Sequence, residues 1–494
     1  MLSRQSDRAL LAPSRREWLR ETGYGIGGIA LAQLLATESI AARRPSGSSS
    51  PRGSHNLLPK QPDFRPRAKS IILLMQNGAP SQIDLFDPKP ELSKRSGQVH
   101  VEKVETFQNG SEDNRLLGTP YKFYKRGACR MDFSEALPHM ASLADEWCMV
   151  RSMHTHHNNH TEALVIFATG KFFAGRPTLG AWVGYGLGTE NQDLPSYIVL
   201  RDPQGYSTNG TELWQSGWLP AIYRGTEFRS QGSAVLNLRS NQTLPDGVRR
   251  NALDLLENLN RKHLDKHPGD SELESRIFNY ELAARMQLSA NNVVDISKES
   301  AATRSLYGLD QDHTANYGKR CLMARRLIEA GVRFVQVLPP AKSTQPWDSH
   351  SDTKAQIGAI APQIDQPSAA LIRDLKSRGL LEETIVIWAG EFGRLPVSQH
   401  SKGRDHNRNA FTILIAGGGF KSGFIHGATD ELGYRSVDKR VSVADLHATL
   451  LHQLGIDHRK LSYPHLGREE TLTDRAVTRA HVVGDLLNHS PQIT

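Results

Sequence analysis

Five short runs of apolar residues constrain the fold of this chain more than any other feature. They are SIILLM at 70–75, YIVL at 197–200, VRFVQVL at 332–338, TIVIW at 384–388 and FTILIA at 411–416. Runs of this kind are typical of strands that are buried on both faces, as in a parallel sheet. Helical segments at 318–330 and 369–378 lie between them and end at Gly331 and Gly379, as helix C-caps do. This alternation predicts an α/β fold with a mainly parallel central sheet between helices.

Two further segments complete the predicted domain, which we place at residues 68–480. Leucines and other apolar residues recur at helical spacing between 249 and 308, which predicts a helical insertion that covers the sheet or forms a lid. Residues 441–454 have the pattern of a strand end followed by a helix. Residues 481–494 are interpreted as a C-terminal tail.

The N-terminal 42 residues have the pattern of an export signal. Paired Arg15 and Arg16 with Leu19 precede an apolar run at 24–36, and small residues follow at Ala41 and Ala42. The run holds about a dozen residues, well short of the ~20 that span a bilayer. The pair of arginines resembles a twin-arginine signal, which implies the twin-arginine export machinery as a partner and a periplasmic or secreted protein. An amphipathic N-terminal helix is the alternative.

Composition narrows the class of protein further. Residues 43–67 are rich in Ser, Pro and basic groups, which predicts a disordered linker. The net charge of +8 is spread along the chain without a basic block that interleaves aromatic residues, so nucleic acid is not an expected partner. No later stretch is apolar enough for a transmembrane segment in the mature protein. The three cysteines lack metal-site spacing and leave the disulfide state open.

Histidine carries most of the chemical information, with 20 in the chain. The segment MHTHHNNHT at 153–161 concentrates four of them, and imidazole is the commonest protein ligand for Zn and similar metals. A solvated histidine-rich loop is the alternative. WDSH at 347–350 places Asp348 and His350 two residues apart, so both side chains point the same way on an extended chain. A turn held by a Trp–Asp hydrogen bond is the alternative there.

Acidic residues also follow or precede the apolar runs. Asp84 lies in the loop after 70–75, Glu391 follows 384–388, and Asp405 with His406 precedes 411–416. Two of these places have a plain structural alternative: an Asx-rich turn for Asp84, and an ion pair with Arg394 for Glu391. Asp445 and His447 are weaker candidates for the same site, because Asp445 is equally suited to cap the N-terminus of a helix. Open α/β sheets gather such strand ends at one edge, so the sequence predicts one shared site.

The motifs together resemble the bacterial domain-of-unknown-function 1501 family from about Ala68 to Leu472. The resemblance lies in LLMQNGAPSQIDLFDPKP, RSMHTHHNNH, GRPTLGAWVGYGLGTENQDLP, WDSH, WAGEFGR, GRDHN and DLHATLLHQLGIDH. That family is similar to the alkaline phosphatase–sulfatase superfamily, so the resemblance implies its sheet and one or two metals at the strand ends. The metal would be divalent: Zn, Ca or Mn. The implied ligand candidates are Asp84, His154, His157, Asp348, His350, Glu391, Asp405 and His406.

The chain departs from the superfamily pattern at two places. The paired Asp residues expected after the first strand are replaced by Gln76 and Asn77. The Cys/Ser-x-Pro-x-Arg nucleophile motif of sulfatases is absent, and its place before Thr169-Gly170 holds His160-Thr161, which argues against a formylglycine mechanism. A hydroxyl of Thr155 or Thr161, or water, would attack instead. Arg394 or Arg404 would hold the anion.

The resemblance therefore implies an exported metal-dependent hydrolase of phosphate or sulfate esters. The substrate would be an anionic small-molecule or polysaccharide ester. The candidate catalytic residues are Thr155, His160, Thr161 and Arg394. The alternative is a non-catalytic metal-binding or scaffold protein on the same fold, which the missing nucleophile favours.

Overall fold

The computed structural model describes residues 56–230, 246–267, 271–341 and 343–491. The chain divides into two compact units, one comprising 1–54 and 243–270 and the other 55–242 and 271–494. In the first unit the described part is the helix α8 (Asp246–Lys266). The expected leader at 1–42 lies outside the described residues. The second unit holds the sheet and every residue discussed below.

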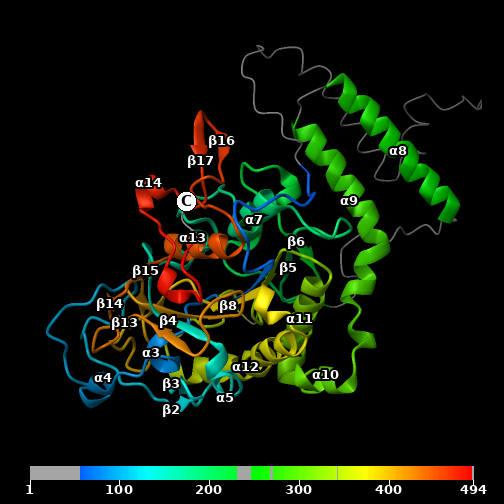
Figure 1. Ribbon diagram of the computed structural model, residues 1–494. Coiled ribbons are helices and arrows are strands. Elements are labelled where there is room, and N and C mark those ends of the chain that lie inside the picture. The colour runs from blue at the N-terminus through cyan, green and yellow to red at the C-terminus, as the bar shows by residue number, and fades with distance from the viewer. Residues whose placement is uncertain (1–55, 231–245, 268–270, 342, 492–494) are drawn as a thin grey trace, which may run out of the picture. The chain divides into compact units, whose positions relative to one another are not determined.

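A mixed sheet of nine strands forms the centre of the second unit's described part (Figure 1). Its strands are, in spatial order, β12 (Phe424–His426), β4 (Cys148–His154), β11 (Phe411–Ala416), β8 (Thr384–Ala389), β1 (Ser70–Met75), β7 (Phe334–Val337), β5 (Tyr197–Leu200) and β6 (Thr226–Phe228), with β15 (Val441–Ser442) paired to β4. β11 runs antiparallel to its neighbours β4 and β8, and the other pairings in this sheet are parallel. The predicted α/β class with a mainly parallel sheet is confirmed.

Helices cover both faces of this sheet. Figure 1 shows α11 and α12 on one side and α7 and α13 on the other. The α-helices of the second unit are α3 (Gln82–Leu85), α4 (Pro90–Lys94), α5 (Pro138–Ala141), α6 (His160–Thr169), α7 (Leu179–Leu187), α9 (Ser271–Val294), α10 (Ala301–Leu306), α11 (Asp312–Glu329), α12 (Thr353–Ser377), α13 (Val443–Gln453) and α14 (Arg475–Thr478). The 3-10 helices are η1 (Ala144–Glu146), η2 (Gly210–Trp214), η3 (Ala221–Tyr223), η4 (Ile296–Lys298), η5 (Leu381–Glu383) and η6 (Gly484–Leu486).

Four two-stranded ribbons lie outside the main sheet in the described part. They are β2 (Phe123–Arg126) with β3 (Met131–Ser134), β9 (Gly393–Arg394) with β10 (His406–Asn407), β13 (Ala428–Thr429) with β14 (Ser436–Asp438), and β16 (Tyr463–His465) with β17 (Arg468–Glu470). The β9–β10 ribbon matters most for function, because it aligns His406 with Arg394 across the strand pair.

The apolar runs locate the central strands because those strands are buried on both faces. Every residue of β1, β8 and β11 is buried. The helix that ends before Gly379 is longer than the predicted 369–378, since α12 begins at Thr353 and continues through Pro362 and Pro367. Proline normally interrupts a helix, which is why the sequence pattern indicated only its last turns.

The flanks of the domain differ from the sequence prediction in a physical detail. Residues 56–67, which the sequence assigns to the linker, lie against the domain: Leu57 is buried, and the backbone N–H groups of Lys60 and Phe64 bond to Leu187 and Gly455. In the segment predicted as a tail, Leu486 is buried as well. A few apolar side chains anchor both segments, and Leu486 lies in the short 3-10 helix η6. The three cysteines are free thiols.

Candidate metal centre

Four strands of the main sheet end at one edge and a fifth begins there, so the adjoining loops come together. β1, β7 and β8 are parallel, β4 runs in the same direction, and the antiparallel β11 begins at that edge. Asp348 and His350 lie in the loop between β7 and α12, and His406 lies in β10 just before β11. His160 is the first residue of α6, after β4. The predicted gathering of strand ends therefore occurs.

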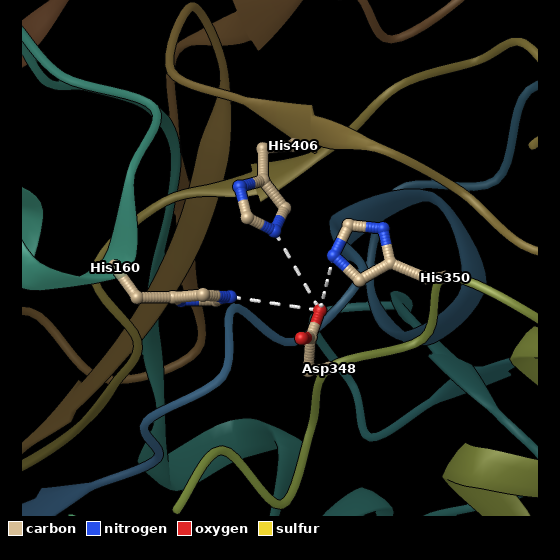
Figure 2. A group of neighbouring side chains, drawn as sticks. All are labelled: His160, Asp348, His350 and His406. Carbon is tan, nitrogen blue, oxygen red and sulfur yellow. Dashed lines mark ion pairs between the residues drawn. The ribbon is translucent and has the colours of Figure 1, made fainter. Parts of the chain in front are cut away.

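Three imidazoles converge on one carboxylate oxygen at this edge (Figure 2). The Oδ1 atom of Asp348 lies 3.0 Å from Nε2 of His350, 3.5 Å from Nε2 of His160 and 3.6 Å from Nε2 of His406. The four ligand atoms all lie within 4.8 Å of one another. Four donors about 2.1 Å from one tetrahedral Zn²⁺ stand about 3.4 Å apart, and the three distances from Asp348 to the imidazoles lie close to this value.

The opposite ring nitrogen of each histidine has an acceptor. Nδ1 of His160 lies 2.5 Å from Oε1 of Glu391, and Nδ1 of His406 lies 2.6 Å from the carbonyl oxygen of Asn158. Nδ1 of His350 lies 2.5 Å from Oε1 of Gln399, whose amide nitrogen donates to the carbonyl of Asn109 at 2.8 Å. These partners accept, so each Nδ1 carries the proton and each Nε2 presents a lone pair.

The residues present fit a metal cation. The Nε2 atoms of His160, His350 and His406 are buried and have no hydrogen-bond partner among the described residues. Lone pairs on three nitrogens and a carboxylate oxygen repel one another unless a positive charge lies among them. Buried donors of this kind are paired or coordinate metals in folded proteins. The His/Asp cluster can therefore hold a divalent ion.

The charges around the cluster are strongly coupled. Burial alone would raise the pKa of Asp348, but Arg394, and then the three imidazoles, hold that pKa well below its usual range. Burial lowers the pKa of His406 to about 3, with Arg394 and His160 acting in the same direction. Burial opposes protonation of His160 too, but the nearby carboxylates of Asp348 and Glu391 raise its pKa. The two carboxylates thus favour the protonated form of His160, whereas burial disfavours that of His406.

Arg394 fixes the carboxylate of Asp348. Its Nη2 donates to Oδ1 at 2.7 Å, and the same guanidinium donates to the carbonyls of Gly78, Ala79 and Arg404 at 2.5, 3.0 and 3.2 Å. The side chain is fully buried. The guanidinium of Arg394 therefore bonds to groups inside the protein and does not face solvent, where an anionic substrate would arrive.

The loop after β1 supports the segment that carries Asp348. Gln76 accepts the indole N–H of Trp347 at 3.0 Å, and the side-chain amide of Asn77 donates to the carbonyl of Thr344 at 2.6 Å. Gly78 has a positive φ of 106°, and a Cβ there would lie 2.6 Å from the backbone nitrogen of Trp347. Gln76 and Asn77, which stand where the superfamily resemblance implies two Asp residues, position this loop.

Two aromatic rings pack against the imidazoles of the cluster. Phe392 is buried and lies 4.8 Å from the ring of His160 and 4.7 Å from that of His406, centroid to centroid. Phe107 stacks on His406 at 4.8 Å and 14°, and 39% of Phe107 is exposed. The side chain of Asp348 is 25% exposed. Solvent therefore reaches the cluster at Asp348 and beside Phe107.

Three of the predicted acidic ligands lie next to the cluster or away from it. Glu391 contacts His160 and also accepts the backbone N–H of Gly78 at 2.9 Å. Asp405 accepts the N–H groups of Phe107 and Gln108 at 2.6 and 2.9 Å, and its Oδ1 is 3.9 Å from Nδ1 of His350. The fully buried Asp84 forms an ion pair with Arg404.

Asp84 and Arg404 form a buried ion pair. Oδ2 and Oδ1 of Asp84 accept from Nε and Nη2 of Arg404 at 2.7 and 3.1 Å, and the hydroxyl of Ser81 donates to Oδ2 at 2.5 Å. Both side chains have no exposed surface. Neither residue is placed in the cluster: Asp84 has its positive partner, and the guanidinium of Arg404 is used inside the protein.

The remaining predicted residues lie on the 155–160 loop or beside it. His154 ends β4 and lines a separate cavity, and His157 lies 3.7 Å from Glu162. Thr155 is buried and Thr161 is exposed, and no hydrogen bond joins either to the cluster among the described residues.

The two weaker candidates lie on α13 and have structural roles. Asp445 is the N3 residue of a capping box with Ser442 at the start of this helix, so it acts as a helix cap. His447 is buried and bonds to the carbonyl of Phe167.

Two partners in the site were not foreseen. The Gln399 side chain and the Asn158 carbonyl orient His350 and His406. The sequence does not show which backbone carbonyl will accept from a histidine. A single glutamine in a loop likewise does not indicate that it orients a histidine ring.

An α/β sheet with a His₃Asp cluster at the shared strand edge defines this molecule as a candidate metalloprotein. The chain belongs to the family described as Protein of unknown function (DUF1501), whose model matches residues 68–487. The family identified from the motifs is thereby confirmed. No curated protein matches the chain in sequence.

Solved structures with a similar arrangement share little sequence with this chain. Lipoteichoic acid synthase LtaP from Listeria monocytogenes is 10% identical, with a TM-score of 0.32 over 83% of this chain and 76% of its own. Phosphonate monoester hydrolase SpPMH from Silicibacter pomeroyi is 13% identical, with a TM-score of 0.31 over 72% and 73%. A protein in the alkaline phosphatase superfamily from Vibrio parahaemolyticus is 11% identical, with a TM-score of 0.34 over 81% and 69%. None of the helices in the described residues is long and apolar enough to cross a membrane.

Proposed function

We propose that this protein is an exported, metal-dependent hydrolase of phosphate or sulfate esters. Its metal would be held by His160, Asp348, His350 and His406. The observation that carries the metal assignment is the convergence of three Nε2 atoms on Asp348, each ring fixed at Nδ1 by an acceptor. The ester chemistry rests on membership of the family and on the resemblance of its motifs to the phosphatase–sulfatase superfamily.

The donor set favours zinc among the divalent metals. Three imidazole nitrogens and one carboxylate are ligands that Zn²⁺ prefers in four-coordinate sites. Calcium takes six to eight oxygen ligands, and these four residues supply one carboxylate. Manganese prefers oxygen-rich octahedral sites. We therefore assign zinc ahead of calcium and manganese.

The residues around the metal have separate tasks in this proposal. A bound divalent metal supplies a Lewis acid for an ester oxygen and lowers the pKa of water. Arg394 holds Asp348 in place, and Glu391 keeps the proton of His160 on Nδ1. Because Thr155 and Thr161 make no described hydrogen bond to the cluster, water is the nucleophile that we favour. The organic part of the ester would lie beside the exposed face of Phe107.

A specific observation also favours a non-catalytic metal protein. Four protein donors complete the tetrahedral shell of zinc, and structural zinc sites are closed in this way, whereas catalytic ones keep a position open. A hydrolase would need room for water and the ester beside these four residues. Asp348 lies where solvent would enter, because its side chain is 25% exposed, and Arg394 holds its carboxylate.

The location of the protein is part of the proposal. The pair Arg15–Arg16 and the apolar run after it indicate export by the twin-arginine machinery to the periplasm or beyond. That route carries folded proteins, which would allow the metal to be loaded before export. The substrate would then be an anionic small molecule or a polysaccharide ester outside the cytoplasm.

Metal analysis combined with ester hydrolysis tests the proposal. The purified protein is expected to contain one zinc ion per chain and to hydrolyse p-nitrophenyl phosphate or p-nitrophenyl sulfate. His406→Ala should lose both properties, whereas His313→Ala, at an exposed position of α11, should keep them. Stoichiometric zinc without turnover of either ester would establish the non-catalytic alternative. A protein without zinc, whose melting temperature a chelator leaves unchanged, would overturn both.

A further inference from the structure

A cavity lined by both polar and apolar residues lies next to the histidine-rich loop. It has a volume of about 330 Å³ and is formed by the end of β4, the helix α6, the start of α13 and the end of α14. Its lining residues are His154, Thr155, His156, Ile166, Gly170, Ser442, Val443, Ala444, Asp445, Thr478, Arg479 and His481. Pockets for small molecules begin at about this size. None of the four clustered metal-site residues is among the lining residues.

The cavity is lined by hydrogen-bond donors at two depths. His156, Arg479 and His481 are exposed and stand at its mouth. His154 is half-buried, and Thr155 is 7% exposed with a hydroxyl that has no hydrogen-bond partner among the described residues. A buried hydroxyl without a partner costs free energy, which a ligand in the cavity would recover.

The one carboxylate among these lining residues is held by hydrogen bonds within the protein. Asp445 accepts from the backbone N–H and hydroxyl of Ser442 at 2.9 and 2.6 Å. It also accepts the backbone N–H of His481 at 3.0 Å and lies 2.9 Å from Nδ1 of the same residue. One carboxylate oxygen is thus bonded to the N-terminal turn of α13, and the other contacts His481. The positive charge of Arg479 has no such counterpart in the lining.

The position of α13 adds to the attraction for an anion. This helix has 11 residues, and its first turn, at Ser442 to Ala444, lines the cavity. A helix N-terminus carries a partial positive charge that favours phosphate or sulfate groups, and the carboxylate of Asp445 offsets part of that charge here. Burial, with the nearby charges of Arg440 and His156, lowers the pKa of His154 to about 4, so this ring is a neutral donor at pH 7.

We propose that this cavity binds the phosphate or sulfate group of a monosaccharide-sized ligand. Arg479 pairs with the anion, the hydroxyl of Thr155 and the ring of His154 donate to it, and the apolar side chains of Ile166 and Val443 contact the carbon skeleton. The site is separate from the metal centre and does not depend on catalysis there. The same loop serves both, because Thr155 lines the cavity while His160, at most about 18 Å along an extended chain, belongs to the metal cluster.

Calorimetric titration of the full chain with glucose 6-phosphate and glucose 6-sulfate tests this site. Neutral glucose is the control ligand, and a chelator is added in one series to remove any metal. Saturable binding of either anion is expected with and without the chelator. Thr155→Val, which removes the hydroxyl at nearly constant volume, and Arg479→Gln should each weaken binding about tenfold, the effect of one charged or buried hydrogen bond.

Arg475→Gln is the matched control, since Arg475 is exposed on the same helix α14 and does not line the cavity. It should bind like the parent protein. Absence of saturable binding, or binding that the chelator abolishes while Thr155→Val and Arg479→Gln leave it unchanged, would overturn the proposal. The second outcome would place the anion at the metal. Loss of zinc or of ester hydrolysis alone would leave this test intact.

Discussion

Glu391 and His160 meet at 2.5 Å, from the end of β8 and the start of α6. The carboxylate is fully buried and also accepts the backbone N–H of Gly78, which ties it to the loop after β1. Two elements far apart in the sequence thus share one proton, on the side of the imidazole that faces away from the cluster. A carboxylate in this position fixes the tautomer of the ring and strengthens Nε2 as a ligand.

Replacing Glu391 by Gln should weaken zinc binding without abolishing it. The amide keeps an oxygen for the Nδ1 proton but loses the negative charge, and changes at such outer partners typically cost about 10- to 100-fold in metal affinity. Competition with a chelator of known affinity measures the effect. Glu383→Gln is the control, because Glu383 pairs with Lys69 on the surface at the other end of the same strand. Equal affinities for the two variants would show that the pairing contributes nothing.

Asp84 and Asp348 should respond differently to the same substitution. Asp84→Asn leaves the fully buried Arg404 without its counter-charge, so the free energy of unfolding should fall by about 3–5 kcal/mol while zinc content is kept. Asp348→Asn removes a donor from the cluster, so zinc should be lost. Denaturant unfolding and metal analysis of both variants separate the two roles. Loss of zinc in folded Asp84→Asn would return Asp84 to the ligand set.

The sequence predicts the sheet and the gathering of its strand ends because buried strands are continuous apolar runs. β4 escapes this reasoning, since Arg151 and Ser152 interrupt its apolar residues. Yet β4 leads into the loop that brings His160 to the cluster. The motifs therefore indicated a histidine-rich loop facing the acids, but not which of its histidines reaches them.

The sequence does not show which acidic residues are metal ligands and which have other partners. Asp84, Asp348 and Asp405 all lie near strand ends, and only their partners separate them: a guanidinium for Asp84, three imidazoles with Arg394 for Asp348, and backbone N–H groups for Asp405. Those partners come from segments up to about 300 residues away in the chain. Local pattern carries no information on such pairings.

Arg394 should be among the residues whose replacement costs most stability. Arg394→Lys keeps the charge, but one ammonium cannot reproduce a fork that serves three carbonyls and Asp348. Buried carbonyls left without donors predict a loss of about 3–5 kcal/mol in the free energy of unfolding and weaker zinc binding. Arg408→Lys is the control, since that side chain is 38% exposed and pairs with Glu105. A loss below about 1 kcal/mol for Arg394→Lys would contradict the assigned role.

His447 should make the protein sensitive to acid. The ring is fully buried in α13, its Nε2 lies 2.9 Å from the carbonyl of Phe167, and burial lowers its pKa to about 4. The unfolded chain, with a histidine pKa of about 6.5, binds the proton more readily, so stability is complete above that pH and falls as the pH drops towards 4. The loss at pH 4 is about 3 kcal/mol relative to pH 7.

His447→Gln should remove this part of the pH dependence, because a glutamine amide can donate to the same carbonyl and does not titrate. Urea unfolding at pH 7 and pH 4 should show the parent losing about 3 kcal/mol more than the variant. His313→Gln, at the exposed position on α11, should follow the parent at both values. Parallel losses for the parent and His447→Gln would mean that His447 accepts a proton inside the folded protein at little cost, contrary to its burial between α13 and the carbonyl of Phe167.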